Sequence, residues 1–244
     1  MGAMRINKEK CVNCGLCIER CPVGAIGRDE TGSVVIDREQ CVECCICHIS
    51  GCCRKDALIW EGEDLPWPRK ARYWMSCAQA VYQGSEGPGR GTNECKTNDV
   101  TGRYPEGTIG IGMEFGRPNV GVYIFDIEKA AQRLSKLGYV RFEPVNPVTM
   151  MMSDPATGTF RDELLRERIL SGILEFTVPD DRFEETMRVI EEIAGDIHTV
   201  FSLAIFGKVH GDGTIPQLAV AEKMGISVRP NSKCNVGMGK PYIP

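Results

Sequence analysis

The sequence predicts an α+β protein made of a small cysteine-rich module followed by a larger α+β sandwich. Ten of its thirteen cysteines lie in the first 53 residues, and those residues contain a thirty-residue repeat. Beyond residue 109, apolar residues follow strand and helix spacing in turn, which is typical of successive strand–helix–strand units. We therefore expect a module over residues 1–60, a linker over 61–70 and a second domain over 71–244.

The internal repeat aligns residues 6–17 with residues 36–47, at an offset of thirty. The matched positions include three cysteine pairs. A repeat of this length indicates a duplicated supersecondary unit. Each copy is expected to contain a short strand, over 5–7 or 34–37, then a cysteine loop, then a short helix or turn.

The first copy carries four cysteines in the spacing C-x-x-C-x-x-C-x-x-x-C-P, at Cys11, Cys14, Cys17 and Cys21. Bacterial proteins with two [4Fe–4S] clusters use this run. Its first three thiolates can bind three irons of one cubane, and the fourth, displaced by the next turn, points to another cluster. In a chain without an export signal, such clustering indicates metal ligands rather than disulfides. The alternative is a zinc site, which needs only four ligands.

Residues 4–60 resemble the clostridial-type two-cluster ferredoxins through these motifs. The resemblance implies two [4Fe–4S] clusters whose ligands cross between the copies. Cluster I would be bound by Cys11, Cys14, Cys17 and the last cysteine of the second motif. Cluster II would be bound by Cys41, Cys44, Cys47 and Cys21.

The last cysteine of the second motif departs from that family, because Gly51 stands where the fourth ligand is expected. The candidates are Cys52 and Cys53. The distance along the chain from Cys21 to its following Ala-Ile pair equals that from Cys53 to its following Ala-Leu pair. This register favours Cys53 and leaves Cys52 as the alternative.

We make separate predictions for three other cysteines, Cys45, Cys95 and Cys234. Cys45 occupies the position of Gly15 in the first copy, and we expect it to be a small side chain buried against the cluster. Cys95 and Cys234 each stand beside a lysine among polar and glycine residues. Because a nearby lysine lowers a thiol's pKa, these two are the candidate catalytic or ligand-facing residues.

The second domain is expected to begin with a helix over 70–83 and a long glycine-rich loop over 84–108. Strands are expected over 120–126, 139–142, 148–152, 173–178 and 199–206, and helices over 127–137, 159–171 and from 180 onward. Two strand–helix–strand units of similar size indicate an ACT-like or ferredoxin-like (βαβ) sandwich.

Residues 93–118 resemble part of the anaerobic reductases of the 6-hydroxynicotinate reductase type. The resemblance implies electron delivery to a reductase, and that family also carries flavin. No flavin-binding motif occurs in the chain. The glycines of residues 110–116 lack the spacing of a dinucleotide loop and indicate a glycine-containing strand.

The net charge and the apolar runs of the chain bear on its expected partners and location. The net charge of −4 gives no reason to expect a nucleic-acid or membrane partner. The chain shows neither an apolar run of about 18–20 residues nor a secretory signal, so a cytoplasmic location is expected.

The leading prediction is therefore an electron-transfer protein of anaerobic metabolism with a redox partner protein. One alternative is a reductase component with a substrate or flavin site near Cys95 and Cys234. Another is a redox-responsive regulator whose ACT-like domain binds a small molecule, and a homo-oligomer is a further expectation.

Overall fold

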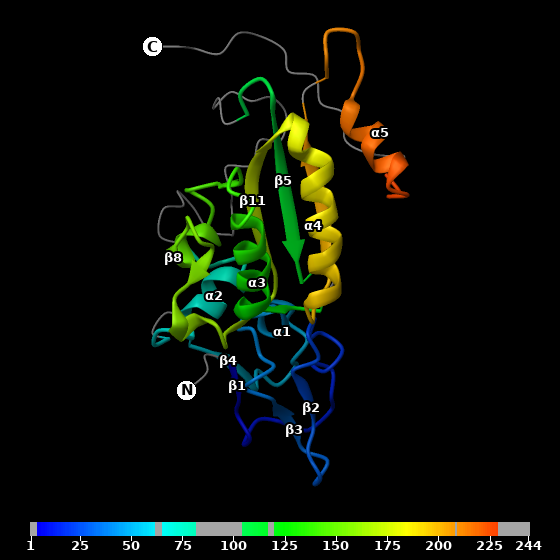
Figure 1. Cartoon of the computed structure of the whole chain (residues 1–244). Coiled ribbons are helices and arrows are strands. Elements are labelled where there is room, and N and C mark those ends of the chain that lie inside the picture. The colour runs from blue at the N-terminus through cyan, green and yellow to red at the C-terminus, as the bar shows by residue number, and fades with distance from the viewer. Residues whose placement is uncertain (1–3, 62–64, 82–103, 117–119, 208, 229–244) are drawn as a thin grey trace, which may run out of the picture.

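The computed structural model describes residues 4–61, 65–81, 104–116, 120–207 and 209–228, and shows a mixed α+β architecture. It has two apolar cores, one around the cysteines of the N-terminal module and one around a four-stranded sheet. In Figure 1 the module lies beyond the end of the sheet toward which the strand β5 points. In the described part of the chain, no helix has the length and apolar character needed to cross a bilayer.

The N-terminal module interlocks the two copies of the repeat. Its elements are β1 (Met4–Ile6), β2 (Ile26–Arg28), β3 (Val34–Ile36), α1 (Ile46–Ile49) and β4 (Leu58–Trp60). The strand that opens each copy pairs with the strand that follows the other copy's cysteines, giving antiparallel pairs β1–β4 and β2–β3. The strands predicted over 5–7 and 34–37 are thus present, each with slightly different bounds.

The second region is organised by an antiparallel sheet in the order β12-β5-β11-β7. Its strands are β5 (Thr108–Phe115), β7 (Arg141–Phe142), β11 (Gly172–Pro179) and β12 (Phe201–Phe206), and its two long helices are α3 (Ile124–Ser135) and α4 (Phe183–Asp196). Along the chain they follow in the order β5-α3-β7-β11-α4-β12, which is the split βαβ arrangement.

Both long helices are amphipathic and contribute to the same core as the sheet. Alternate residues of β5, namely Ile109, Ile111 and Met113, are fully buried in that core. The glycines between them lie on the opposite face, where the ring of Tyr104 packs so closely on Gly110 that a Cβ would sit 2.0 Å from it. The expected glycine-containing strand is therefore confirmed as β5.

Smaller elements connect these parts. They are α2 (Lys70–Ser76), β6 (Val122–Tyr123), the 3-10 turn η1 (Thr149–Met151), β8 (Met152–Asp154), β9 (Thr159–Phe160), η2 (Asp162–Leu164), β10 (Arg168–Ile169), η3 (Asp180–Arg182) and α5 (Pro216–Lys223). The strand β6 pairs with β10, and β8 pairs with β9.

Several predicted elements of the second region are wrong. The helix predicted over 159–171 is instead β9, η2 and β10, because residues 159–160 pair with β8 rather than starting a helix. The strand predicted over 120–126 shrinks to β6, since α3 begins at Ile124. The strand predicted over 148–152 is mostly the η1 turn. The helix predicted over 70–83 ends at Ser76, because the backbone of Cys77 is extended.

Candidate functional site

The two cysteine loops of the repeat follow the same backbone path. We call residues 11–17 the first loop and residues 41–47 the second loop. The first loop has left-handed residues at Asn13 (φ 53°) and Gly15 (φ 82°), and the second has them at the equivalent Glu43 (φ 56°) and Cys45 (φ 61°). Because non-glycine residues rarely adopt positive φ, this agreement at both positions is specific. The repeat read from the sequence is therefore a repeat of backbone conformation.

The loops also begin with the same turn. The Cys11 N–H donates to the carbonyl of Asn7 over 3.0 Å, and the Cys41 N–H donates to the carbonyl of Asp37 over 3.0 Å. The side-chain oxygens of Asn7 and Asp37 each accept two further backbone N–H groups, as in an Asx turn. A polar residue four positions before each loop thus fixes the direction in which the cysteines leave the strand.

The cysteine that follows each loop shows which residue of the second copy corresponds to Cys21, the fourth cysteine of the first copy. The Ala25 N–H donates to Cys21 Sγ over 3.1 Å, and the Ala57 N–H donates to Cys53 Sγ over 3.3 Å. Both bonds span four residues, so Cys53 occupies the structural position of Cys21. Further backbone N–H groups lower the pKa of the Cys53 thiol and outweigh its partial desolvation.

Cys52 nevertheless interacts electrostatically with a thiol of the first loop. Burial raises the pKa of Cys17, and the charge of Cys52 raises it further, as do those of Cys11 and Cys14. The Cys52 thiol itself points to the carbonyl of Cys47, 3.4 Å away. The backbone register is the stronger criterion, because the four-residue spacing from Cys21 to Ala25 and from Cys53 to Ala57 belongs to the chain path, whereas one χ1 rotation redirects a thiol.

The second loop lines a cavity together with Cys21. Five cysteines line this cavity, namely Cys45 and the four predicted ligands Cys21, Cys41, Cys44 and Cys47, and its other lining residues are apolar. The pKa of Cys41 and of Cys44 is raised to about 11 and that of Cys47 to about 12, chiefly by burial and in part by neighbouring cysteine thiols, including Cys21. Thiols in such a place ionise when a metal supplies positive charge.

Four converging thiols in an apolar cavity therefore suit a thiolate-bound iron–sulfur cluster. Among the described residues, no three His, Cys, Asp or Glu side chains are arranged to hold a single metal ion. That result applies to sites for one metal ion, whereas in a cubane each cysteine binds a different iron. When bound, a cubane would supply one-electron redox chemistry.

The first loop is far more exposed. Cys14 is exposed, while Cys41, Cys44 and Cys47 are buried. The repeat partners Val12, which is 62% exposed, and Val42, which is 1% exposed, show the difference clearly. The first loop thus faces solvent, and the second loop faces protein.

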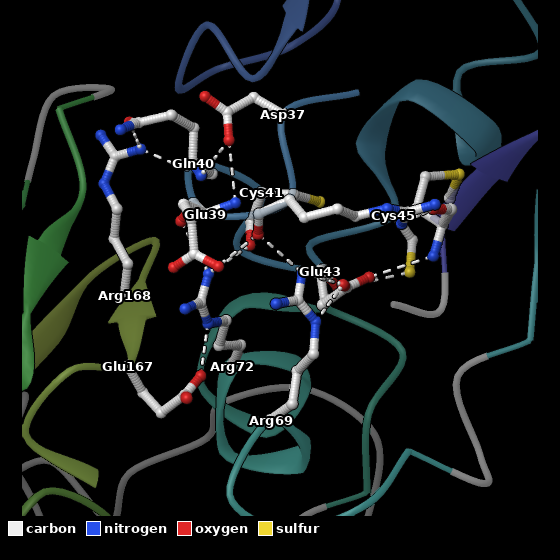
Figure 2. Close-up of polar contacts among 12 residues, drawn as sticks. Asp37, Glu39, Gln40, Cys41, Glu43, Cys45, Arg69, Arg72, Glu167 and Arg168 are labelled. Carbon is white, nitrogen blue, oxygen red and sulfur yellow. Dashed lines mark hydrogen bonds and ion pairs between the residues drawn. The ribbon is translucent and has the colours of Figure 1, made fainter. Parts of the chain in front are cut away.

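Arginines from the region that follows the N-terminal module hold that region against the second loop, as Figure 2 shows. Arg72 of α2 is 2% exposed, and its guanidinium donates to the carbonyls of Glu39 (2.8 Å) and Cys41 (2.9 Å). The same guanidinium pairs with Glu167, next to β10. Arg168 donates to the carbonyl of Gln40 over 3.0 Å. These contacts join the second loop to α2 and β10.

A buried carboxylate completes this junction. Glu43 is fully buried, and its oxygens accept hydrogen bonds from the Arg69 guanidinium at 2.8 Å and from the backbone N–H of Met4 at 3.1 Å. A buried carboxylate is strongly destabilising unless it is paired in this way. Glu43 therefore connects the second loop, β1 and the entry to α2 in one polar network (Figure 2).

A further thiol from the second region reaches the second loop. Cys77, directly after α2, is fully buried and belongs to the same apolar cluster as Cys45, whose thiol donates to the carbonyl of Glu43 over 3.5 Å. Hydrogen bonding between the two thiols lowers the pKa of Cys77 to about 6 and raises the pKa of Cys45. Cys45 is buried, as the sequence predicted, and it lines the same cavity as the four predicted ligands.

The sequence reasoning missed Glu43, Arg72 and Cys77. One signal was available: the first copy has Asn13 where the second has Glu43, and a charged residue in an otherwise buried loop requires a partner. Cys95 and Cys234, the candidate catalytic residues, lie outside the described residues, so their predicted roles stay predictions.

Comparison with known proteins agrees with the N-terminal geometry. Residues 4–27 match the family model described as "4Fe-4S binding domain", a stretch that contains all four cysteines of the first motif. No curated protein matches the chain. No solved structure matches it either. The chain therefore carries a ferredoxin-type iron–sulfur segment at its N-terminus, which supports a role in electron transfer.

Proposed function

We propose that this protein transfers single electrons through two [4Fe–4S] clusters to or from a partner oxidoreductase in anaerobic metabolism. Cluster I takes Cys11, Cys14, Cys17 and Cys53, and cluster II takes Cys41, Cys44, Cys47 and Cys21. The observation that carries the proposal is the repeated backbone of the two loops together with the four-thiol cavity beside the second. The family match covers only the first motif, so the second cluster rests on this geometry.

The unequal exposure of the loops gives the two clusters different roles. Cluster I, under an exposed loop with Cys14 and Val12 at the surface, is where a partner protein exchanges electrons. Cluster II, enclosed between the module and α2, passes electrons onward or stores them. The crossed ligation would connect them, because Cys17 and Cys21 belong to one short turn.

Rapid-mixing experiments on the anaerobic protein test this function. Protein reduced with dithionite and freed of excess reductant is mixed with a one-electron acceptor protein while the cluster absorbance is followed. We expect reoxidation in two steps with one electron delivered per cluster. A protein that binds iron and sulfide but exchanges no electrons with any one-electron acceptor contradicts an electron-transfer role.

A second candidate function is redox-responsive regulation, in which the second region is an ACT-like ligand domain. It is favoured by the split βαβ order of the sheet and by the direct contacts from Arg72 to the second loop and from Arg168 to Gln40 just before it. A change in charge of cluster II would act on these contacts. Sedimentation of oxidised and reduced protein tests it: a redox-dependent oligomer supports regulation, and identical profiles with and without candidate small molecules count against it.

The reductase alternative depends on Cys95 and Cys234. Its distinguishing feature is a flavin or aromatic substrate bound by the second region, as the resemblance of residues 93–118 implies. Flavin fluorescence after denaturation and turnover of the Cys95→Ser and Cys234→Ser variants test it. Full turnover in both variants removes these thiols as catalysts.

A further inference from the structure

The guanidinium of Arg28 lies directly against the first loop. Arg28 is the last residue of β2, and it is exposed. Its Nη2 donates to the carbonyl of Asn13 over 2.9 Å, and its Nη1 donates to the carbonyl of Gly32 over 2.7 Å. A Cβ added to Gly15 would sit 2.9 Å from the same Nη2. The guanidinium therefore lies beside the residues that flank Cys14, a proposed ligand of cluster I.

The positive charge of Arg28 is not neutralised by an ion pair. Both of its hydrogen-bond acceptors are backbone carbonyls, and among the described residues no carboxylate pairs with its guanidinium. The adjacent Asp29 carboxylate instead accepts hydrogen bonds from the Thr31 hydroxyl (2.6 Å) and from the Ser33 N–H (3.0 Å). Arg28 therefore brings an uncompensated positive charge to the first loop.

The second copy of the repeat has an uncharged residue at the equivalent position. The register of Ala25 with Ala57 aligns β2 with β4, so Arg28 corresponds to Trp60. The Trp60 ring packs against the ring of Tyr73, with centroids 5.3 Å apart. Of these two equivalent positions, only that of the first copy carries a charge.

The glycine of the first loop leaves the space that this guanidinium occupies. Gly15 has a positive φ of 82°, and a side chain there would collide with Nη2 of Arg28. The repeat-equivalent Cys45 also has a positive φ, of 61°, and yet carries a side chain. The left-handed backbone alone thus does not require glycine in this loop. The close approach of Arg28 does, so Gly15 and Arg28 form one unit of structure.

We propose that Arg28 is a positioning residue for electron transfer, whose charge raises the reduction potential of cluster I. The inference rests on the proposed function, because cluster I is the group on which Arg28 acts. One electron from the partner oxidoreductase takes a cubane from the 2+ to the 1+ state and makes the cluster with its four thiolates more negative by one charge. A nearby positive charge stabilises that reduced form. Arg28 therefore favours an electron on the cluster under the exposed loop, where a partner protein can collect it.

The exposure of Arg28 limits the size of this effect, because water and salt weaken interactions between exposed charges. Loss of the charge should change the equilibrium between oxidised and reduced cluster I about two- to fivefold. For a one-electron couple this change corresponds to roughly 20–40 mV. The difference should shrink as the ionic strength rises.

Redox titration of the anaerobic holoprotein, followed by EPR, tests the role of the charge. Arg28→Gln removes the charge and keeps a polar side chain, whereas Arg28→Lys keeps the charge. In Arg28→Gln, one of the two midpoint potentials should fall and the other should stay. A soluble paramagnetic ion, which broadens the signal of an exposed cluster more strongly, should identify the shifted potential as that of cluster I. Arg28→Lys should lie closer to the wild type than to Arg28→Gln.

Arg141→Gln is the matched control, since it makes the same change of charge at an exposed arginine of β7 in the second region. It should move neither potential. Full iron with unchanged potentials in Arg28→Gln overturns the inference, and so does an equal fall of both potentials. An equal fall in Arg28→Lys, or loss of iron from Arg28→Gln, also overturns it, because the arginine would then shape the site without tuning it. A wild type without two reducible clusters contradicts the proposed function instead, so the two failures are distinguishable.

Discussion

The first and second cysteine loops have one backbone and two environments. Left-handed residues, Asx turns and N–H···S bonds recur at equivalent positions. Yet the first loop exposes Cys14 and Val12 to solvent, while the second is enclosed by α2 and β10. The comparison teaches that the motif determines what a loop can bind, whereas the surrounding chain determines what can reach it.

The cause of the difference is a small number of substitutions between the copies. Where the first copy has Asn13, the second has Glu43, whose carboxylate is buried against Arg69. Where the first has Gly15, the second has Cys45, which is buried in one apolar cluster with Cys77. Both of these side chains of the second loop lie against residues that follow the module. We therefore infer that the two substitutions adapt the second loop to an interface within the chain.

Removing a ligand should have the largest effect and should separate the two sites. Cys41→Ser and Cys14→Ser should each lose about half of the roughly eight irons of the holoprotein, since each removes one ligand of one cubane. The Cys41 variant should also lose thermal stability more severely, because its empty cavity lies in the core. Iron analysis and thermal denaturation measure both effects. Equal stability loss in the two variants contradicts the different environments of the loops.

Breaking the polar network at Glu43 should have the next largest effect. Glu43→Ala removes the carboxylate partner of the Arg69 guanidinium and the acceptor of the Met4 N–H. We expect a loss of about 3–5 kcal/mol in unfolding free energy, measured by anaerobic denaturant titration. Glu39→Ala, an exposed carboxylate in the same segment, is the control and should leave the midpoint nearly unchanged. A small effect at Glu43 means that the network does not hold the two regions together.

The valine pair tests the same contrast without charge. Val42→Ala should cost about 1.5–3 kcal/mol, because it removes two buried methyl groups at about 0.8 kcal/mol each and leaves a cavity. Val12→Ala at the repeat-equivalent exposed position should stay within about 0.5 kcal/mol. Denaturant midpoints of the two variants give the comparison directly, and similar values would show that both loops are equally covered.

The smallest expected effect concerns the pH dependence of cluster loading. Burial raises the pKa of Cys41, Cys44 and Cys47 to between about 11 and 12, and binding iron requires the thiolate, so each ligand releases a proton on loading. Affinity at the second site therefore rises with pH up to the thiol pKa and falls as pH decreases. Iron uptake by metal-free Cys14→Ser, which retains the second site, should increase more between about pH 7 and about pH 9 than that of Cys44→Ser. Equal pH dependence contradicts a buried second site.

Part of this structure could be predicted from the sequence, because local patterns encode it. The repeat fixed the equivalence of the loops, and the helical spacing of Phe183, Met187 and Ile190 correctly predicted α4. The helix predicted over residues 159–171 is wrong because the Thr-x-x-Asp sequence resembles the start of a helix. In the structure, the pairing of β9 with β8 determines the conformation at this place. The contacts of Arg72 and Cys77 join residues about thirty positions apart, and no periodicity records such pairs.

The central claim is that both loops hold a cubane, and metal analysis with EPR tests it most directly. Anaerobically reconstituted protein should contain about eight irons and eight sulfides per chain. After reduction, its EPR spectrum should show two [4Fe–4S]¹⁺ centres that interact magnetically. Bound zinc, or about four irons with one isolated signal after full reconstitution, would contradict the account.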